Sequence, residues 1–253
     1  MRSVLGIDVG GSSIKAAVVD IASGQAVTPL ASVPTPQPSL PERLLEVFVE
    51  LDARFAAGGP VGLAVPCVVQ RGVTRTAANV DHAWIGYDCE SALRSRLGRR
   101  VAVLNDADAA GLAEIRWGAG RGTRGVVIVL TFGTGIGSAI FNDGQLLPNT
   151  EFGHLEMNGQ DAEHLASARV RTVEHLDWPA WAERVNAYLA RMHALFWPDV
   201  FILGGAVSEN FAQFAPLLKS PAEIRAAQFG GHAGLVGAAL AASLAAARPE
   251  GQG

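Results

Sequence analysis

A strand–glycine-turn–strand unit occurs twice in this chain and constrains its fold more than any other feature. The first copy is Ile7–Asp20 (IDVGGSSIKAAVVD) and the second is Leu130–Asp143 (LTFGTGIGSAIFND). Laid on each other without a gap, both copies run through a glycine turn into an apolar strand that ends on Asp. Turns rich in Gly and Ser or Thr leave backbone N–H groups unshielded, and such groups form anion-binding concavities. One copy opening each half of the chain predicts two halves that hold a polyphosphate between them.

The order of the expected elements predicts two mixed α/β lobes, because strands come first in each half and then alternate with helices. The expected strands are 4–8, 14–20, one within 25–33, 61–65, 101–104, 126–131, 137–142 and 200–203. The expected helices are 41–56, 90–97, 106–117, 178–196 and 233–247, and a loop-rich insert covers 148–164. We place a smaller N-terminal lobe at residues 1–104 with helix 233–247, and a larger C-terminal lobe at 105–232. The tail 249–253 is expected to be disordered.

Composition narrows the class of protein. The net charge of −4 comes without a Lys/Arg tract, which argues against a nucleic-acid or membrane surface. Cys67 and Cys89 have no metal-like spacing and are too few for a disulfide framework. No secretory leader precedes the first strand and no apolar run reaches membrane-spanning length, so a cytoplasmic location is expected.

The first turn carries the motif D-x-G-G-S-x-x-K, formed by Asp8, Gly10, Gly11, Ser12 and Lys15. The glycines permit close backbone approach to phosphate, the serine adds a hydroxyl donor, and the lysine supplies a positive charge. Asp8 ends a strand and could order hydrated Mg²⁺ near the phosphates. The alternative is a tight hairpin with a solvated lysine.

The second turn contains Gly133, Thr134, Gly135 and Gly137. It lacks the Gly-Lys-Ser/Thr of a Walker motif, and a strand rather than a helix follows it, which excludes a Rossmann turn. Alone it fits a phosphate cradle and an ordinary hairpin equally well. Its pairing with the first turn favours the cradle.

Asn105 and Asp106 lie where the apolar strand VAVL meets a helix that begins DADAAGLAE. A carboxylate at the carboxyl end of such a strand projects into the crevice where ligands bind in open α/β sheets. Asp106 could therefore accept a proton from an attacking sugar hydroxyl. The alternative is helix capping, for which Asn and Asp are preferred.

The insert gathers Glu151, His154, Glu156 and Glu163, and its spacing matches neither a zinc site nor a deaminase. Several carboxylates and an imidazole in one loop suit hydrogen bonding to the vicinal hydroxyls of a carbohydrate. A solvated loop is the alternative. Asn79 is a further polar residue among apolar neighbours.

Taken together, these segments resemble the ROK family of sugar kinases in the actin-like ATPase superfamily. LGIDVGGSSIKAAVVD is similar to its first phosphate motif, and LTFGTGIGSAIFNDGQLLPNTEFGHLE to its second phosphate motif and sugar loop. TAANVDHAWIG, VLNDADAAGLAE, ILGGAVS and AGLVGAAL are similar as well, so the resemblance covers nearly the whole chain. Within the family the match is to polyphosphate glucokinases. The resemblance implies an α/β fold with two lobes and a central cleft, the actin-like (ribonuclease H-like) ATPase fold.

The resemblance also implies roles for the residues that match the family's motifs. Asp106 falls on the catalytic base that activates the sugar 6-hydroxyl. The implied sugar contacts are Asn79, Asn105, Glu151, His154 and Glu163. The implied phosphate sites are Asp8, Gly10, Gly11, Ser12, Lys15, Thr131, Gly133, Thr134, Gly135, Gly204 and Gly205.

The chain departs from the family pattern at three places. The stretch that carries a C-x-C-G-x-x-G-C zinc motif in many members is short and cysteine-free here, which predicts no structural zinc. Polyphosphate glucokinases share that lack. A Pro-Gly near the sugar is Pro66-Cys67, and the third glycine of a G-G-G turn is Ala206.

The implied activity is that of a glucokinase that uses Mg²⁺ with polyphosphate, ATP or both, and family precedent favours a homodimer. One alternative is an ATP-dependent kinase of another hexose, such as mannose or an N-acetylhexosamine. Another is a sugar-sensing regulator without turnover, but those carry an N-terminal helix-turn-helix, whereas the first strand here begins at the third or fourth residue. A polyphosphate chain would need a basic track, for which Arg75, Arg116, Arg121 and Arg124 are candidates, although they equally fit an ordinary surface.

Overall fold

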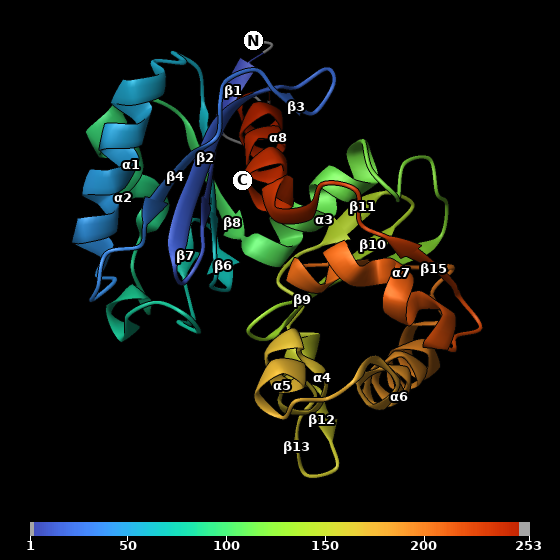
Figure 1. Cartoon of the computed structure of the whole chain (residues 1–253). Coiled ribbons are helices and arrows are strands. Elements are labelled where there is room, and N and C mark those ends of the chain that lie inside the picture. The colour runs from blue at the N-terminus through green and yellow to red at the C-terminus, as the bar shows by residue number, and fades with distance from the viewer. Residues whose placement is uncertain (1–2, 248–253) are drawn as a thin grey trace. The chain divides into compact units, whose positions relative to one another are not determined.

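The computed structural model describes residues 3–247, which form two compact units (Figure 1). The first unit contains the residues up to Ala113 together with those from His232 onward, and the second is Glu114–Gly231. Residues 105–113 therefore belong to the first unit, whereas the division expected from sequence assigns them to the second lobe. The tail expected to be disordered, 249–253, lies outside the described residues.

The first unit is built on a mixed sheet in the order β3-β2-β1-β5-β8, with β4 paired to β2. Strands β1, β5 and β8 run parallel, and β2 is antiparallel to β1. The sheet strands are β1 (Ser3–Val9), β2 (Ser13–Asp20), β3 (Gln25–Ala26), β4 (Ala31–Pro34), β5 (Val61–Val65) and β8 (Val101–Asn105). Two short strands, β6 (Val69–Gln70) and β7 (Val73–Thr74), form a separate pair. The third strand expected within 25–33 is thus two short strands.

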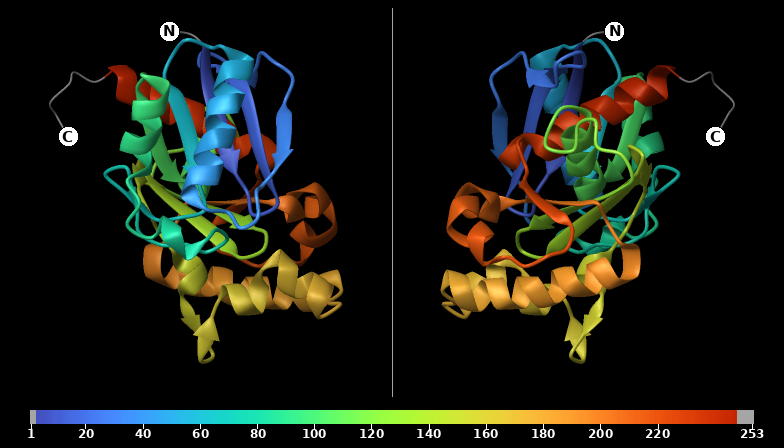
Figure 2. Two further views of the ribbon diagram at one scale, coloured as in Figure 1. Left: turned by 90° about the vertical axis from the view of Figure 1, so that its left-hand side faces the viewer. Right: turned by 90° about the vertical axis from the view of Figure 1, so that its right-hand side faces the viewer.

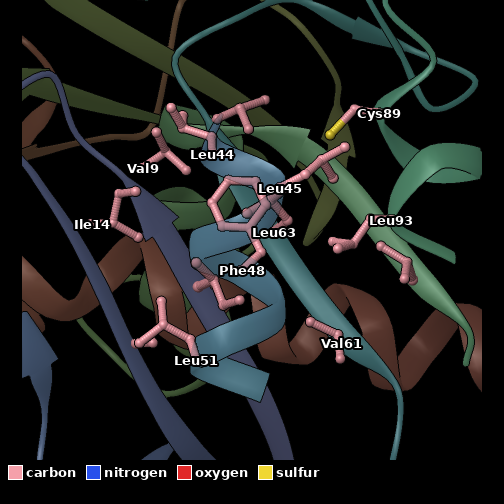
Figure 3. Packing of buried hydrophobic residues seen from close by; sticks show 14 of the residues in the cluster. Val9, Ile14, Leu44, Leu45, Phe48, Leu51, Val61, Leu63, Cys89 and Leu93 are labelled. Atoms are coloured by element: carbon pink, nitrogen blue, oxygen red, sulfur yellow. The ribbon is translucent and has the colours of Figure 1, made fainter. Parts of the chain in front are cut away.

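Helices cover both faces of this sheet. Helices α1 (Pro41–Phe55) and α2 (Cys89–Leu97) lie on one face and α8 (Ala233–Ala247) on the other, while α3 (Asp106–Arg116) follows β8 (Figure 1). The helical spacing of Leu44, Leu45, Phe48 and Leu51 produces a buried stripe on α1. Figure 3 shows this stripe packed over the strand residues of the same core.

Helix α8 is the most apolar helix of the chain. By length and composition alone, the stretch Gly230–Ala247 could cross a membrane, contrary to the expectation that no run is long enough. Half of that stretch is nevertheless buried inside the protein. Its N-terminal part packs against β1 and β5, as expected for a core helix.

The second unit has a sheet in the order β11-β10-β9-β14-β15, in which β9, β14 and β15 run parallel. Its strands are β9 (Val126–Phe132), β10 (Ile136–Asn142), β11 (Gln145–Leu147), β14 (Val200–Gly204) and β15 (Glu223–Ala226). Its helices are α4 (Glu163–Ala166), α5 (Ala168–Val173), α6 (Trp178–Phe196) and α7 (Phe211–Phe214). The short hairpin of β12 (Glu156–Met157) and β13 (Gln160–Asp161) projects beyond α6 (Figure 2).

Both glycine units form antiparallel hairpins, but their turns differ in length. In the first hairpin Val9 pairs with Ile14, which leaves Gly10–Ser13 in the turn. In the second, Phe132 pairs with Ile136, which leaves only Gly133–Gly135. The gapless sequence alignment therefore matches the wrong residues, by one position, in the second strand of each hairpin. Structurally equivalent residues are those with the same place in the strand pairing, whatever their residue type.

Candidate active site

The conformation of the first turn is held by hydrogen bonds to its carbonyl groups. The N–H of Gly10 donates to the carbonyl of Ser13 at 3.0 Å, which closes the turn. The hydroxyl of Thr35 donates to the Gly10 carbonyl at 2.6 Å, and the Thr35 N–H to the Ser12 carbonyl at 3.1 Å. With these carbonyls bound, the exposed face of the turn is formed by Gly11 and Ser12. This face suits a bound anion.

Asp8 lies beside this turn, in β1, opposite Lys15 of β2. Its carboxylate is partly buried, and burial raises its pKa to about 6 even though the positive charge of Lys15 acts to lower it. Above that pH the carboxylate is ionised beside a phosphate-type turn. An oxygen donor of this kind fits hydrated Mg²⁺, which binds through few carboxylates and keeps several waters.

Asn105 and Asp106 mark the junction between β8 and α3. The Asn105 Oδ1 accepts from the N–H groups of Ala107 at 2.8 Å and Asp108 at 3.0 Å, and so caps the helix. Its Nδ2 donates to the carbonyl of Cys67 at 3.3 Å, and the residue is buried. The capping role that was the alternative for Asp106 is thus filled mainly by its neighbour. Asp106 is partly exposed, and its Oδ1 accepts from the Ala107 N–H at 2.8 Å.

Asn79 is exposed and lies beside the first turn. A methyl group built on Gly11 would be 3.6 Å from the Cβ of Asn79. Cys67, which replaces a family glycine, is buried at 2 % exposure, and its N–H donates to Val65 at 2.8 Å. The cysteine is therefore accommodated in a tight turn with its carbonyl available to Asn105.

The second turn lies against the turn that follows β14. Thr131 pairs with Gly204 in register, and a side chain at Gly205, where φ is +82°, would overlap the backbone of Phe132. The positive φ and the close approach to Phe132 both require glycine at position 205. The glycine turn itself is closed by a 3.0 Å bond from the Gly133 N–H to the Gly135 carbonyl. Two expected phosphate segments, 131–135 and 204–205, thus adjoin each other in this unit.

The second unit also brings the acidic residues of the insert together. The Nδ1 of His154 lies 2.9 Å from an Asp161 oxygen, and its Nε2 lies 3.9 Å from an oxygen of Glu151. The bond to Asp161 is the main reason why the pKa of His154 is raised. Burial, together with the charge of Glu163, raises the pKa of Glu151, whereas His154 lowers it.

Glu163 connects this group to the second turn. Its Oε2 accepts from the Ile136 N–H at 3.2 Å, and a side chain at Gly135 would overlap the same oxygen. Helix α6 holds the insert and α4 through two side-chain hydrogen bonds. The Tyr188 hydroxyl donates to the Phe152 carbonyl at 3.1 Å, and the Trp181 indole donates to the Ala166 carbonyl at 3.0 Å. Glu151, His154 and Glu163 therefore form one polar cluster beside the turn.

Sequence reasoning missed two residues near these groups. Asp161 lies 2.9 Å from His154 and orients it, and only its place seven residues later in the same insert could have suggested it. Arg169 is exposed, and its backbone N–H donates to the Gly133 carbonyl at 3.0 Å, so the backbone of this basic residue adjoins the second turn. No local motif marks Arg169, because the contact joins residues 36 positions apart.

Within residues 3–247, no three His, Cys, Asp or Glu side chains are grouped to hold a metal ion. The absence of structural zinc remains a prediction. A Mg²⁺ ion near Asp8 would be held chiefly by phosphate oxygens and water, and Asp8 would be its protein ligand.

Comparison with known proteins gives a consistent result. The sequence model of the ROK family matches residues 4–170. The chain is 45% identical to a polyphosphate glucokinase of Mycobacterium tuberculosis (strain CDC 1551 / Oshkosh) over 95% of this chain and 91% of that protein. The inorganic polyphosphate/ATP-glucomannokinase of Arthrobacter sp. strain KM matches with a TM-score of 0.92 and 43% identity, covering 97% of this chain and 100% of that one. A ROK glucokinase of Streptomyces griseus in complex with glucose and AMPPNP matches with a TM-score of 0.82 and 26% identity, over 96% and 99% of the two chains.

Proposed function

The chain belongs to the ROK family, and we propose that it is a glucokinase that transfers a terminal phosphoryl group from polyphosphate, ATP or both to the 6-hydroxyl of glucose. The observation that carries this proposal is the 45% identity to a polyphosphate glucokinase over nearly the whole chain. The match to a glucomannokinase supports mannose as a second acceptor. The α/β architecture is that of the actin-like ATPases, to which these sugar kinases belong.

Asp106 acts as the general base in this proposal. Its carboxylate takes the proton of the 6-hydroxyl while the sugar oxygen attacks the terminal phosphorus. The new bond joins O6 to phosphorus, and the bond that breaks joins phosphorus to the bridging oxygen of the donor. The electron pair leaves with the shortened polyphosphate or with ADP. Asn105 holds the helix start from which Asp106 projects.

The sugar is bound through hydrogen bonds in this proposal. The Glu151 and Glu163 side-chain oxygens accept from sugar hydroxyls, and His154 is oriented for the same purpose by Asp161. Asn79 and Asn105 are the remaining expected contacts. A site that pairs every sugar hydroxyl discriminates against sugars that lack one of them.

The phosphoryl donor is held by the two glycine turns, Lys15 and the Gly204–Gly205 turn. Their N–H groups and positive charge stabilise the charge that develops on the transferred group. Mg²⁺, when bound near Asp8, would neutralise donor phosphates. We further propose a cytoplasmic enzyme that forms a homodimer.

A coupled assay for glucose 6-phosphate tests the function. Purified protein is supplied with Mg²⁺, glucose and either polyphosphate or ATP, and the assay is repeated with mannose and N-acetylglucosamine. The proposal requires product from glucose with at least one donor and weaker or no product from the N-acetylated sugar. Binding of sugar without turnover under every condition would favour the regulator.

We expect Asp161→Asn to weaken sugar binding through His154. Loss of the carboxylate removes the main cause that raises the pKa of His154, so its pKa should fall in an NMR titration. The imidazolium, which persists above the usual pKa of about 6.5 in the wild type, is then lost at lower pH. One weakened hydrogen bond is worth about 1 kcal/mol, so the KM for glucose should rise about fivefold. Glu183→Gln, an exposed change on α6, serves as the control. An unaltered His154 pKa in Asp161→Asn would contradict this role.

Arg169→Ala is expected to raise the KM for polyphosphate. The backbone of this exposed residue is hydrogen-bonded to the second turn, and attraction of a polyanion to a cation near that turn would be salt-dependent. We expect a several-fold rise in the KM for polyphosphate at low salt, with the KM for glucose unchanged. Arg191→Ala on α6 removes an equivalent exposed charge and should leave both values unchanged. Equal effects of the two substitutions would show a general charge effect instead.

A further inference from the structure

Gly234, the second residue of α8, lies directly against the carboxyl group of Asp8. A methyl group built on this glycine would be 2.6 Å from the Asp8 Cγ and 2.7 and 2.8 Å from its two carboxyl oxygens. Real Cβ atoms do not approach other atoms so closely, so any side chain at position 234 must displace something. Glycine is also less favourable than alanine within a helix, which means that its presence here calls for a compensating reason.

Helix α8 is closely packed against its neighbours in the first unit, which leaves it little room to shift. Side chains at Gly6 in β1 and Gly62 in β5 would overlap the carbonyls of Leu235 and Ala238, so α8 rests on the bare backbone of two strands. A side chain at Gly237, one turn further on, would overlap the carbonyl of Ala109 in α3. Three close contacts therefore hold α8 within the first unit. Because protein interiors are close-packed, the strain of an added methyl group would be passed on to neighbouring atoms.

The backbone of Asp8 is equally fixed. Its strand is hydrogen-bonded on both sides, with Asp8 paired to Lys15 in β2 and to Ala64 in β5. Only the side chain of Asp8 can give way, by rotation of its carboxyl group. A methyl group at position 234 would therefore change where this carboxylate points.

We propose that Gly234 is a positioning residue for the phosphoryl-transfer reaction, which keeps open the space occupied by the Asp8 carboxylate. The catalytic part of this inference rests on the proposed function, because Asp8 is assigned there to the donor phosphates and their Mg²⁺. The contact itself does not depend on that assignment. Gly234 reaches the reaction only through Asp8 and touches no substrate.

The test is a double-mutant cycle of Gly234→Ala and Asp8→Ala, read by thermal unfolding and by kinetics. Alanine at position 8 removes the Cγ and both oxygens that the new methyl group would meet. Gly234→Ala alone should lower the melting temperature by several degrees, as overpacking does. In the Asp8→Ala background the same substitution should cause no decrease. Independent packing would instead give equal decreases in both backgrounds, and that result would overturn the proposal.

Kinetics supply the second measurement. Gly234→Ala should lower kcat at least tenfold and leave the KM for glucose within twofold, since the displaced group serves the donor. A variant with wild-type kcat would overturn the catalytic part. If Gly234→Ala fails to fold, recovery of folded protein in the double variant supports the contact, and no recovery overturns it. If the wild type phosphorylates no sugar, the proposed function fails while the thermal cycle still decides the contact.

Discussion

Replacement of Asp106 by alanine is expected to abolish nearly all glucose phosphorylation while the fold is retained. A positioned general base contributes about 10²–10⁴-fold to a rate, and no other carboxylate is proposed for this role. The side chain is partly exposed at the start of α3, so its removal leaves no large cavity. Turnover should therefore fall by about a thousandfold, with an unchanged circular dichroism spectrum.

Two variants make this result specific. Asp106→Asn keeps the size of the side chain and should be nearly as inactive, because an amide cannot accept the proton at neutral pH. Glu50→Ala removes an exposed carboxylate from α1 of the same unit and should retain full activity. An Asp106→Ala protein that keeps even a tenth of wild-type turnover would disprove the assignment of the base.

Asn105→Ala is expected to impair both stability and activity. The helix cap is worth about 1 kcal/mol, and loss of the hydrogen bond to the Cys67 carbonyl costs about a further 1 kcal/mol. The start of α3 would loosen beside Asp106, and a misplacement of about 1 Å can cost a hundredfold in rate. Chemical denaturation and steady-state kinetics measure the two effects.

The matched control is Asp88→Ala, which removes the cap of α2. Asp88 accepts from the Ser91 N–H at 3.0 Å, far along the chain from the proposed base. This variant should lose a similar cap energy of about 1 kcal/mol and keep wild-type kcat. Equal kinetic losses in Asn105→Ala and Asp88→Ala would mean that instability alone lowers the rate. Asn105→Asp keeps the capping oxygen but not the donor to Cys67, and so separates the two contacts.

Much of the fold could be predicted from the sequence because its signals are local. The helical spacing of Leu44, Leu45, Phe48 and Leu51 identified α1, and the predicted helix at 178–196 has the bounds of α6. Pairing register is not local, which explains why the gapless alignment of the two hairpins slipped by one residue. The apolar composition of α8 likewise did not reveal how closely its backbone approaches two strands.

The candidate site divides in the same way. The position of Asp106 after an apolar strand, and the acidic cluster of the insert, could be predicted from residue type and order. The roles of Arg169 and Gly234 could not, since each depends on a contact with a segment distant in the sequence. The contact of Asp161 with His154 is local, but no spacing rule marks it. For Asn105, the capping position could be predicted from the sequence. Its hydrogen bond to the Cys67 carbonyl became visible only in the folded structure.

Phosphorus NMR of the reaction products tests the central claim most directly. Wild-type protein is incubated with Mg²⁺, glucose and either polyphosphate or ATP, and the new phosphoester is assigned by its coupling to the sugar protons. We expect the phosphoryl group on O6 of glucose, formed in step with loss of terminal phosphate from the donor, and no such product from Asp106→Ala. Phosphate on another hydroxyl, or only free phosphate from both donors, would contradict the account.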